Sequence, residues 1–272
     1  MSRLPFALVA AACLGTMVVA AALAPAHLGP FDMAHAYAGP SSLPPFGADE
    51  RGRPLLDYAL QGARVVAAPS IAAGLLVTAA ATVGGILRAT GSARTDAWLH
   101  ALAEIVGALP RMVVLLVVAL VLPRDERTLL PLALTWAVLA APGAMDEAAT
   151  VAERLGGALF VEALRAHGYG PVRIYGLHVV WRNLRPVVVR QGAEVAMQVI
   201  FLEVALSYLA RSGDQPSFTH PDDLRSIADL LSLGYPALVL DLPTAHALVL
   251  GLACIALPAV LMLSLTHAAR AR

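Results

Sequence analysis

The residues with the clearest potential for chemistry form a polar stretch from Phe160 to Pro186, between two apolar runs. Phe160, Leu164 and His167 recur at helical spacing, which predicts a short helix with one mostly apolar side. Gly168 follows, and a glycine can adopt the left-handed backbone conformation that ends a helix. A short polar helix and turn beside a bilayer suits the docking of a soluble partner. The residues expected to contact this partner are Glu162, Ala163, Arg165, His167 and Gly168.

Charged residues inside the apolar runs are a second set of candidates. Glu203 lies in one such run, and Glu104 and Arg111 share another, seven residues apart and therefore about two helical turns along one face. A charge at the bilayer centre costs ~2.5–3.5 kcal/mol on insertion scales, so such residues are functional candidates by default. The alternative is a buried carboxyl that only ties helices together. We expect Glu203 to face the bundle interior, with Arg111 as its partner.

The sequence contains no arrangement typical of an active site. It has no G-x-S-x-G or H-E-x-x-H motif, and its eight histidines and two cysteines do not follow zinc-ligand spacing. All 19 basic residues are arginine, so the lysine of a phosphate-binding loop is missing. We predict no catalytic residue, no metal and no cofactor, with any ATP hydrolysis in a partner chain. The net charge of zero gives no reason to expect nucleic-acid binding.

The composition is that of a membrane protein. Only 14% of residues are charged, against ~25% in typical soluble domains. A spanning helix needs about 20 apolar residues. We therefore expect an all-α membrane protein with six transmembrane helices and both termini on one side, and Pro110 should kink the third span. The first run could instead be a cleaved signal peptide. The six expected spans are Leu4–Leu23, Val65–Leu87, Ala97–Leu122, Leu129–Met145, Pro186–Ala210 and Leu242–Ala268.

The arginines favour one orientation of these spans. With the N-terminus inside, ten arginines lie in inner segments and seven in outer ones, and cytoplasmic segments generally carry the excess. Both termini and the polar stretch are then cytoplasmic. We divide the chain into 1–64, the first span with an outer segment, and 65–272, a core of five spans. This core contains a cytoplasmic loop, 146–186, between the fourth and fifth spans and an acidic outer loop, 211–241, that suits an interfacial helix or a lid.

Three segments, in order, resemble the permease subunits of ABC importers of the dipeptide, oligopeptide and nickel type. Glu162-Ala163-Leu164, followed three residues later by Gly168, is similar to their Glu-Ala-Ala loop. The stretch PFGADERGR at 45–53, followed by GAR at 62–64, is similar to PFGTDxxGRD…GAR, and LEVALSYL at 202–209 is similar to LEAALSFLG. The resemblance covers about residues 45–210. The sequence departs from the family pattern at Pro54, Leu164, Trp181 and Asp146-Glu147-Ala148-Ala149.

The resemblance implies a multi-pass subunit in the inner membrane of a bacterium that forms half of a pathway for peptides or a related small solute. The implied partners are a second permease subunit, homologous or identical, two ATP-binding subunits docked at the cytoplasmic loop, an extracytoplasmic substrate-binding protein and membrane lipid. An outer gate or interface, with local ion pairs and a turn, is expected at Asp49, Arg51, Gly52 and Arg53.

Two other functions fit the sequence less well. One is a diverged permease-like scaffold that assembles but transports nothing. It is favoured by the end of the chain, where residues 266–270 lack the Gly-, Asp- and Arg-rich ending of the family. The other is a membrane enzyme, against which the lack of a catalytic motif argues. Neighbouring genes for an ATPase and a binding protein would favour transport.

Overall fold

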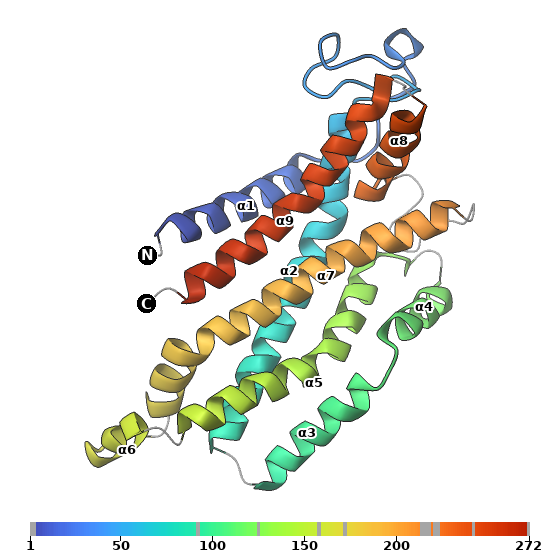
Figure 1. Ribbon diagram of the computed structural model, residues 1–272. Coiled ribbons are helices and arrows are strands. Elements are labelled where there is room, and N and C mark those ends of the chain that lie inside the picture. The colour runs from blue at the N-terminus through green and yellow to red at the C-terminus, as the bar shows by residue number, and fades with distance from the viewer. Residues whose placement is uncertain are drawn as a thin grey trace.

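The computed structural model of the chain is a bundle of long helices (Figure 1). Apart from an isolated β-bridge between Ala48 and Pro54, the part of the chain that the structure describes is helix, turn or loop. An all-α architecture is therefore confirmed. The described residues are 4–90, 93–123, 126–156, 159–170, 173–212, 219, 224–240 and 243–270.

Five helices are long and apolar enough to cross a membrane. A sixth crossing results if two shorter helices, α3 (Ala93–Gly107) and α4 (Arg111–Val121), are counted as one broken span. These numbers agree with a multi-pass helical membrane protein. The five long helices are α1 (Leu4–Leu23), α2 (Leu55–Thr90), α5 (Leu129–Gly156), α7 (Arg185–Ser212) and α9 (His246–Arg270).

The third expected span is interrupted more sharply than a kink. The axes of α3 and α4 differ by 70°, and the break falls immediately before Pro110, which is in an extended conformation at the start of α4. Proline has no backbone N–H to donate and disfavours helical geometry at the preceding residue, so the helix ends there. Glu104 and Arg111 consequently lie on different helices, and the prediction that they share one helical face is wrong.

Helix α2 is the centre of the bundle and packs against both α5 and α7. Its crossing with α7 depends on two glycines: a Cβ added to Gly192 would lie 2.6 Å from the carbonyl oxygen of Gly74. Small residues at such crossings let two backbones approach closely, which is the usual basis of helix association in membranes. The buried core around α2 is otherwise mostly alanine, valine and leucine, with a few larger aromatic and aliphatic side chains.

The two ends of the bundle differ (Figure 1). One end, which we call the α6 end, contains the short helix α6 (Leu159–Ala166) and the π-helix η3 (Arg173–Leu184), where α2 and α5 end and α7 begins. Both marked termini lie on this side of the bundle. The opposite α8 end contains the segment 24–54 with a 3₁₀ turn, η1 (Met33–His35), the helix α8 (Ile227–Val239), and a second 3₁₀ turn, η4 (Pro243–Ala245).

Several helix boundaries differ from the expected ones. Helix α2 begins at Leu55, ten residues before the expected span, so residue 64 lies inside it. Helix α5 continues past Met145 to Gly156, because Ala148, Ala149 and Ala152 extend its buried face. The connection expected at 146–186 is shorter for this reason and is itself largely helical. In the region 211–241, expected to suit an interfacial helix or a lid, the described part contains the helix α8, Ile227–Val239.

Candidate functional site

The turn after α6 has the geometry that its glycine predicts. Gly168 has φ +77°, its N–H donates to the carbonyl of Arg165, and the N–H of Tyr169 donates to the carbonyl of Leu164 at 3.1 Å. This pair of hydrogen bonds is the Schellman motif that satisfies the last carbonyls of a helix. A Cβ on Gly168 would have no atom within 4 Å. The turn is therefore determined by the backbone of glycine and is open on its outer side.

Helix α6 presents a polar face away from the bundle. Val161 is fully buried and Leu164 is partly buried against the core. The expected apolar side was wrong at one position, because His167 is exposed and its Nδ1 lies 2.7 Å from the carbonyl oxygen of Ala163; the side chain of Phe160 lies outside the described part. The residues predicted to dock a partner are all exposed: Glu162, Ala163, Arg165, His167 and Gly168.

The π-helix η3 connects α6 to the bundle. Its side chains Ile174, Val179 and Leu184 are almost completely buried among α2, α5 and α7. One hydrogen bond joins the exposed helix to this buried one, since Nη2 of Arg165 donates to the hydroxyl of Tyr175 at 2.5 Å. A π-helix in a helical protein often marks a functional position. The structure thus attaches an exposed polar helix to the core through a packed element.

Helices α5 and α7 are linked by polar side chains that the sequence analysis did not identify. Nη2 of Arg190 and Nε2 of Gln191 each donate to one carboxylate oxygen of Glu147. Nearer the middle of the bundle, Nε1 of Trp136 donates to Oε1 of Gln198 at 2.9 Å. Glu147 was missed because the fourth span was expected to end at Met145. The signal that could have revealed α7's polar face is Gln191, Glu194 and Gln198, which recur at helical spacing.

Glu203 is completely buried on another face of α7. Its Oε1 accepts a hydrogen bond from Oγ of Ser207 at 2.8 Å, and that hydroxyl lies 2.8 Å from Oγ1 of Thr219. Its Oε2 is also buried, and none of the described residues meets it with hydrogen-bond geometry. The expected partner was wrong: the guanidinium of Arg111 lies 5.9 Å from the ring centre of Trp136, over its face. The break before α4 places Arg111 against Trp136 of α5, and Glu203 is instead bound to Ser207.

Glu104 is largely exposed, and its Oε1 lies 3.4 Å from Nε2 of His100 one turn earlier on α3. His100 also approaches Asp146 of α5. A carboxylate this exposed inside an apolar helix pair is not stable against lipid hydrocarbon. This face of α3 must therefore contact water, headgroups or protein.

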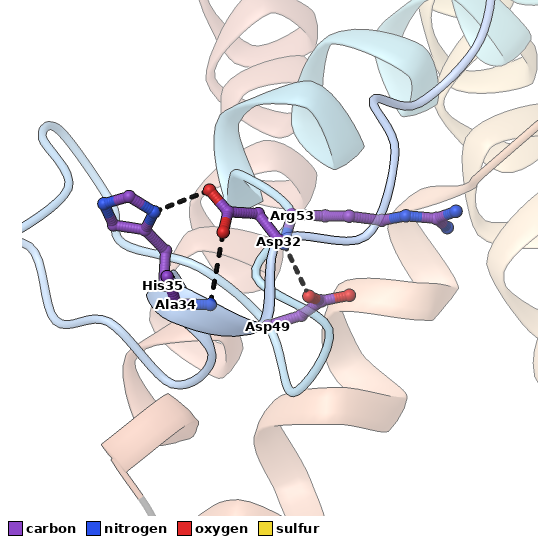
Figure 2. Close-up of polar contacts among 5 residues, drawn as sticks. All are labelled: Asp32, Ala34, His35, Asp49 and Arg53. Carbon is purple, nitrogen blue, oxygen red and sulfur yellow. Dashed lines mark hydrogen bonds and ion pairs between the residues drawn. The ribbon is translucent and has the colours of Figure 1, made fainter.

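The segment 24–54 is organised by the carboxylate of Asp49, which is buried. Its Oδ1 accepts hydrogen bonds from the backbone N–H groups of Arg51 and Arg53, each at 2.8 Å, and its Oδ2 accepts one from the Tyr58 hydroxyl at 2.6 Å. Figure 2 shows the Arg53 contact and the neighbouring Asp32, whose carboxylate is bound by Ala34 and His35. The expected turn at Gly52 is present, with φ +76°.

Of the local ion pairs expected in this segment, the one between Arg51 and Glu50 is present, and the guanidinium groups of Arg51 and Arg53 also lie over an aromatic ring. The guanidinium of Arg53 lies over the ring of Phe31, 4.5 Å from its centre, and that of Arg51 lies at 5.5 Å. Arg51 also approaches the exposed Glu50 at 3.7 Å. Asp49 uses backbone donors because it closes the turn around Gly52. The segment 24–54 is folded, and the carboxylate of Asp49 holds that fold together.

No metal centre is apparent in the described residues. They contain no group of three His, Cys, Asp or Glu side chains able to hold a metal ion. A groove of about 280 Å³ lies between α1, α2, α7 and α9, and its lining is apolar except for two hydroxyls, those of Ser70 and Thr78. Both hydroxyls donate to carbonyls of their own helix. This groove suits lipid chains or packed side chains and offers no recognition of a polar solute.

The described polar features are therefore an exposed polar face on α6, polar contacts between α5 and α7, and the buried carboxyl of Glu203. No protein-family model matches the chain, and no curated protein matches its sequence.

Proposed function

We propose that the chain is the membrane-spanning permease subunit of an ABC importer and that it docks a separate ATPase through α6. The observation that carries the proposal is α6 itself, a short helix with an exposed polar face, ended by a left-handed glycine and placed between α5 and α7. The three segments that resemble importer permeases add to it. The docking residues would be Glu162, Ala163, Arg165, His167 and Gly168.

The polar face of α7 supports a second part of this proposal. Arg190, Glu194 and Gln198 lie inside an apolar span, yet their side chains are only partly buried in the single chain. Groups of this kind avoid lipid and face a bundle interior, an aqueous path or another subunit. A homologous or identical permease would cover them and complete a path for a peptide or a related small solute, delivered by an extracytoplasmic binding protein.

The mechanism that follows is alternating access driven by a partner. Nucleotide binding would close two ATPase domains, shift the docked α6 helices and tilt the two bundles between inward-open and outward-open states. The subunit would contribute no catalytic group. Orientation in the inner membrane, with both termini in the cytoplasm, belongs to the same proposal.

The test is capture of the ATPase by the docking face. The full chain carrying Ala163→Cys, with Cys13 and Cys254 replaced by serine, would be cross-linked in membranes of its native host. We expect Ala163→Cys to be cross-linked to a protein that contains a phosphate-binding loop. The matched exposed control, Val138→Cys on α5, should capture no such protein. Proteoliposomes containing the captured complex should take up solute with ATP. Capture without uptake would indicate the non-transporting scaffold, and absence of any ATPase would contradict the proposal.

A further inference from the structure

The carboxylate of Glu147 is bound on both oxygens by one neighbouring helix. Oε1 accepts from Nη2 of Arg190, and Oε2 accepts from Nε2 of Gln191. Glu147 lies in the last third of α5, whereas Arg190 and Gln191 lie in the first two turns of α7. These are the two helices that enter and leave the segment containing α6. The contact therefore closes a loop whose other side is α6 and η3.

This contact matters because α5 and α7 touch each other much less than either touches α2. Each is held to α2 by close backbone packing, through Gly192 for α7 and through Met145 against Gly84 for α5. Between α5 and α7 themselves, the described polar links include the Glu147 contact and the Trp136–Gln198 hydrogen bond. Of these two links, the Glu147 contact is the one nearer the α6 end.

The ion pair between Arg190 and Glu147 is also stable, as a contact that transmits movement between two helices must be. The side chains of Arg190 and Glu147 are 35% and 40% exposed, so neither is fully hydrated. An unpaired charge at such a position in a membrane span is unfavourable, and removal of one partner leaves the other uncompensated. Each charge therefore holds the other in place. The amide of Gln191 occupies the second carboxylate oxygen and fixes the orientation of the carboxyl group.

Helix α6 is connected to α7 through η3. Arg165 on α6 is bonded to Tyr175 of η3. Leu184, the last residue of η3, packs so closely on α2 that a Cβ on Gly85 would lie 2.2 Å from its Cδ2. Helix α7 begins at the next residue. A displacement of α6 thus reaches α7 along the chain through η3, and reaches α5 through the packing of η3 on α5 and through the Glu147 contact.

We propose that Glu147, Arg190 and Gln191 form a coupling clamp, which makes α5 and α7 move as one body when a partner displaces α6. Glu147 is a positioning residue in this scheme. It occupies the stretch Asp146-Glu147-Ala148-Ala149, where the sequence departs from the importer pattern. The inference rests on the proposed function, because only a docked partner would displace α6.

The experiment measures the distance between the two helices in the full chain in lipid nanodiscs. Spin labels replace two exposed arginines, Arg154 near the end of α5 and Arg182 in η3, in a background with both native cysteines replaced by serine. A second pair, Leu87 of α2 with Arg182, is the control for movement of η3 itself. With Glu147→Ala we expect the Arg154–Arg182 distance distribution to shift to longer values and to broaden. The Leu87–Arg182 distribution should not change.

Two further variants separate a clamp from a general loss of structure. Asp146→Asn removes the adjacent acid, which faces His100 of α3, and should leave both distances unchanged. The exchange Glu147→Arg with Arg190→Glu should restore the short Arg154–Arg182 distance, because the pair can form again with reversed charges. If Glu147→Ala fails to insert, Glu147→Gln, which keeps the shape and one acceptor, serves in its place with a smaller expected shift.

The functional readout is solute transported per ATP hydrolysed in the complex with the ATPase. Loss of the clamp should lower this ratio several-fold, while the amount of assembled complex stays the same, and the charge exchange should recover it. Unchanged distances after Glu147→Ala would overturn the clamp, whatever partner the chain has. Separated helices with an unchanged transport ratio would overturn its role in coupling. If no ATPase associates with the unaltered chain, the proposed function fails, and the coupling role fails with it.

Discussion

Gly52, in the segment before α2, and Gly168, after α6, have almost the same backbone conformation, with φ of +76° and +77°. Their surroundings are opposite. A Cβ on Gly52 would lie 1.7 Å from the carbonyl oxygen of Asp32, whereas a Cβ on Gly168 would have no atom within 4 Å. The first turn lies inside a folded segment at the α8 end, and the second projects from the α6 end.

The difference extends to the polar residues beside each turn. The carboxylate of Asp49 is buried and satisfied by three donors within its own segment and α2. The side chains of Glu162 and His167 are exposed. One turn is thus built to hold a fixed local structure, whereas the other lies beside polar groups that are exposed. The same sequence signal, glycine beside charged residues, serves two purposes, and substitutions can separate them.

The largest effect is expected from Gly52→Ala. The methyl group would overlap the backbone of Asp32, and overpacking of this kind costs about 1–3 kcal/mol in addition to about 1–2 kcal/mol for a left-handed alanine. The free energy of unfolding should fall by about 2–5 kcal/mol, as measured by denaturant titration in mixed micelles. An unchanged unfolding midpoint would mean that the segment 24–54 is not packed as described.

Asp49→Ala should have the next largest effect. It leaves the Tyr58 hydroxyl and two backbone N–H groups without their acceptor, and loss of a charged acceptor of this kind costs about 1.5–3 kcal/mol. We expect a loss of about 3 kcal/mol and increased hydrogen exchange at Arg51 and Arg53. The matched control is Glu50→Ala, which removes an exposed acid and should cost less than about 1 kcal/mol. Equal effects of the two substitutions would contradict the buried role of Asp49.

Gly168→Ala should lower the free energy of unfolding less than Gly52→Ala does, although the two glycines have matching φ angles. The added methyl meets nothing, so only the left-handed strain of about 1–2 kcal/mol remains, and it falls on the end of α6. Global unfolding should be unchanged, with faster exchange at the last turn of α6. With Gly168→Val, we expect substrate-stimulated ATPase activity of the complex to fall while the permease still reaches the membrane. Retained stimulation would argue that the turn does not face the ATPase.

The smallest effect concerns pH at the segment 24–54. The hydrogen bond from His35 Nδ1 to Asp32 Oδ2, at 2.7 Å, holds the pKa of Asp32 below its ordinary value of 3.8. Because the pKa is lower in the folded state, the contribution to stability is present above 3.8 and is lost as the pH falls through the lower folded value. The carboxyl is fully exposed, so the effect is small. The protection factor of the Ala34 amide, which corrects for the intrinsic pH dependence of exchange, should fall on acidification in the unaltered chain and be independent of pH in Asp32→Asn.

Local signals in the sequence determined much of this protein. Long apolar runs predict the spanning helices, because a backbone without water must form its hydrogen bonds within a helix. The helix ends at Pro110 and the turns at Gly52 and Gly168 follow from residues whose backbone preferences act within a few positions. The short polar helix α6 and its exposed candidates were also predictable, although His167 was placed on the wrong side.

Only the tertiary structure decided which polar groups meet. The sequence indicates Arg111 as the partner of Glu203, because Arg111 is the one basic residue well inside another membrane run. The 70° break directs α4 to α5 and leaves Glu203 with Ser207 and Thr219. Glu147 meets Arg190 and Gln191 across 43 and 44 residues of sequence. Such pairings depend on where helices cross and how they are rotated. Those quantities come from packing over the whole bundle, which no short stretch of residues contains.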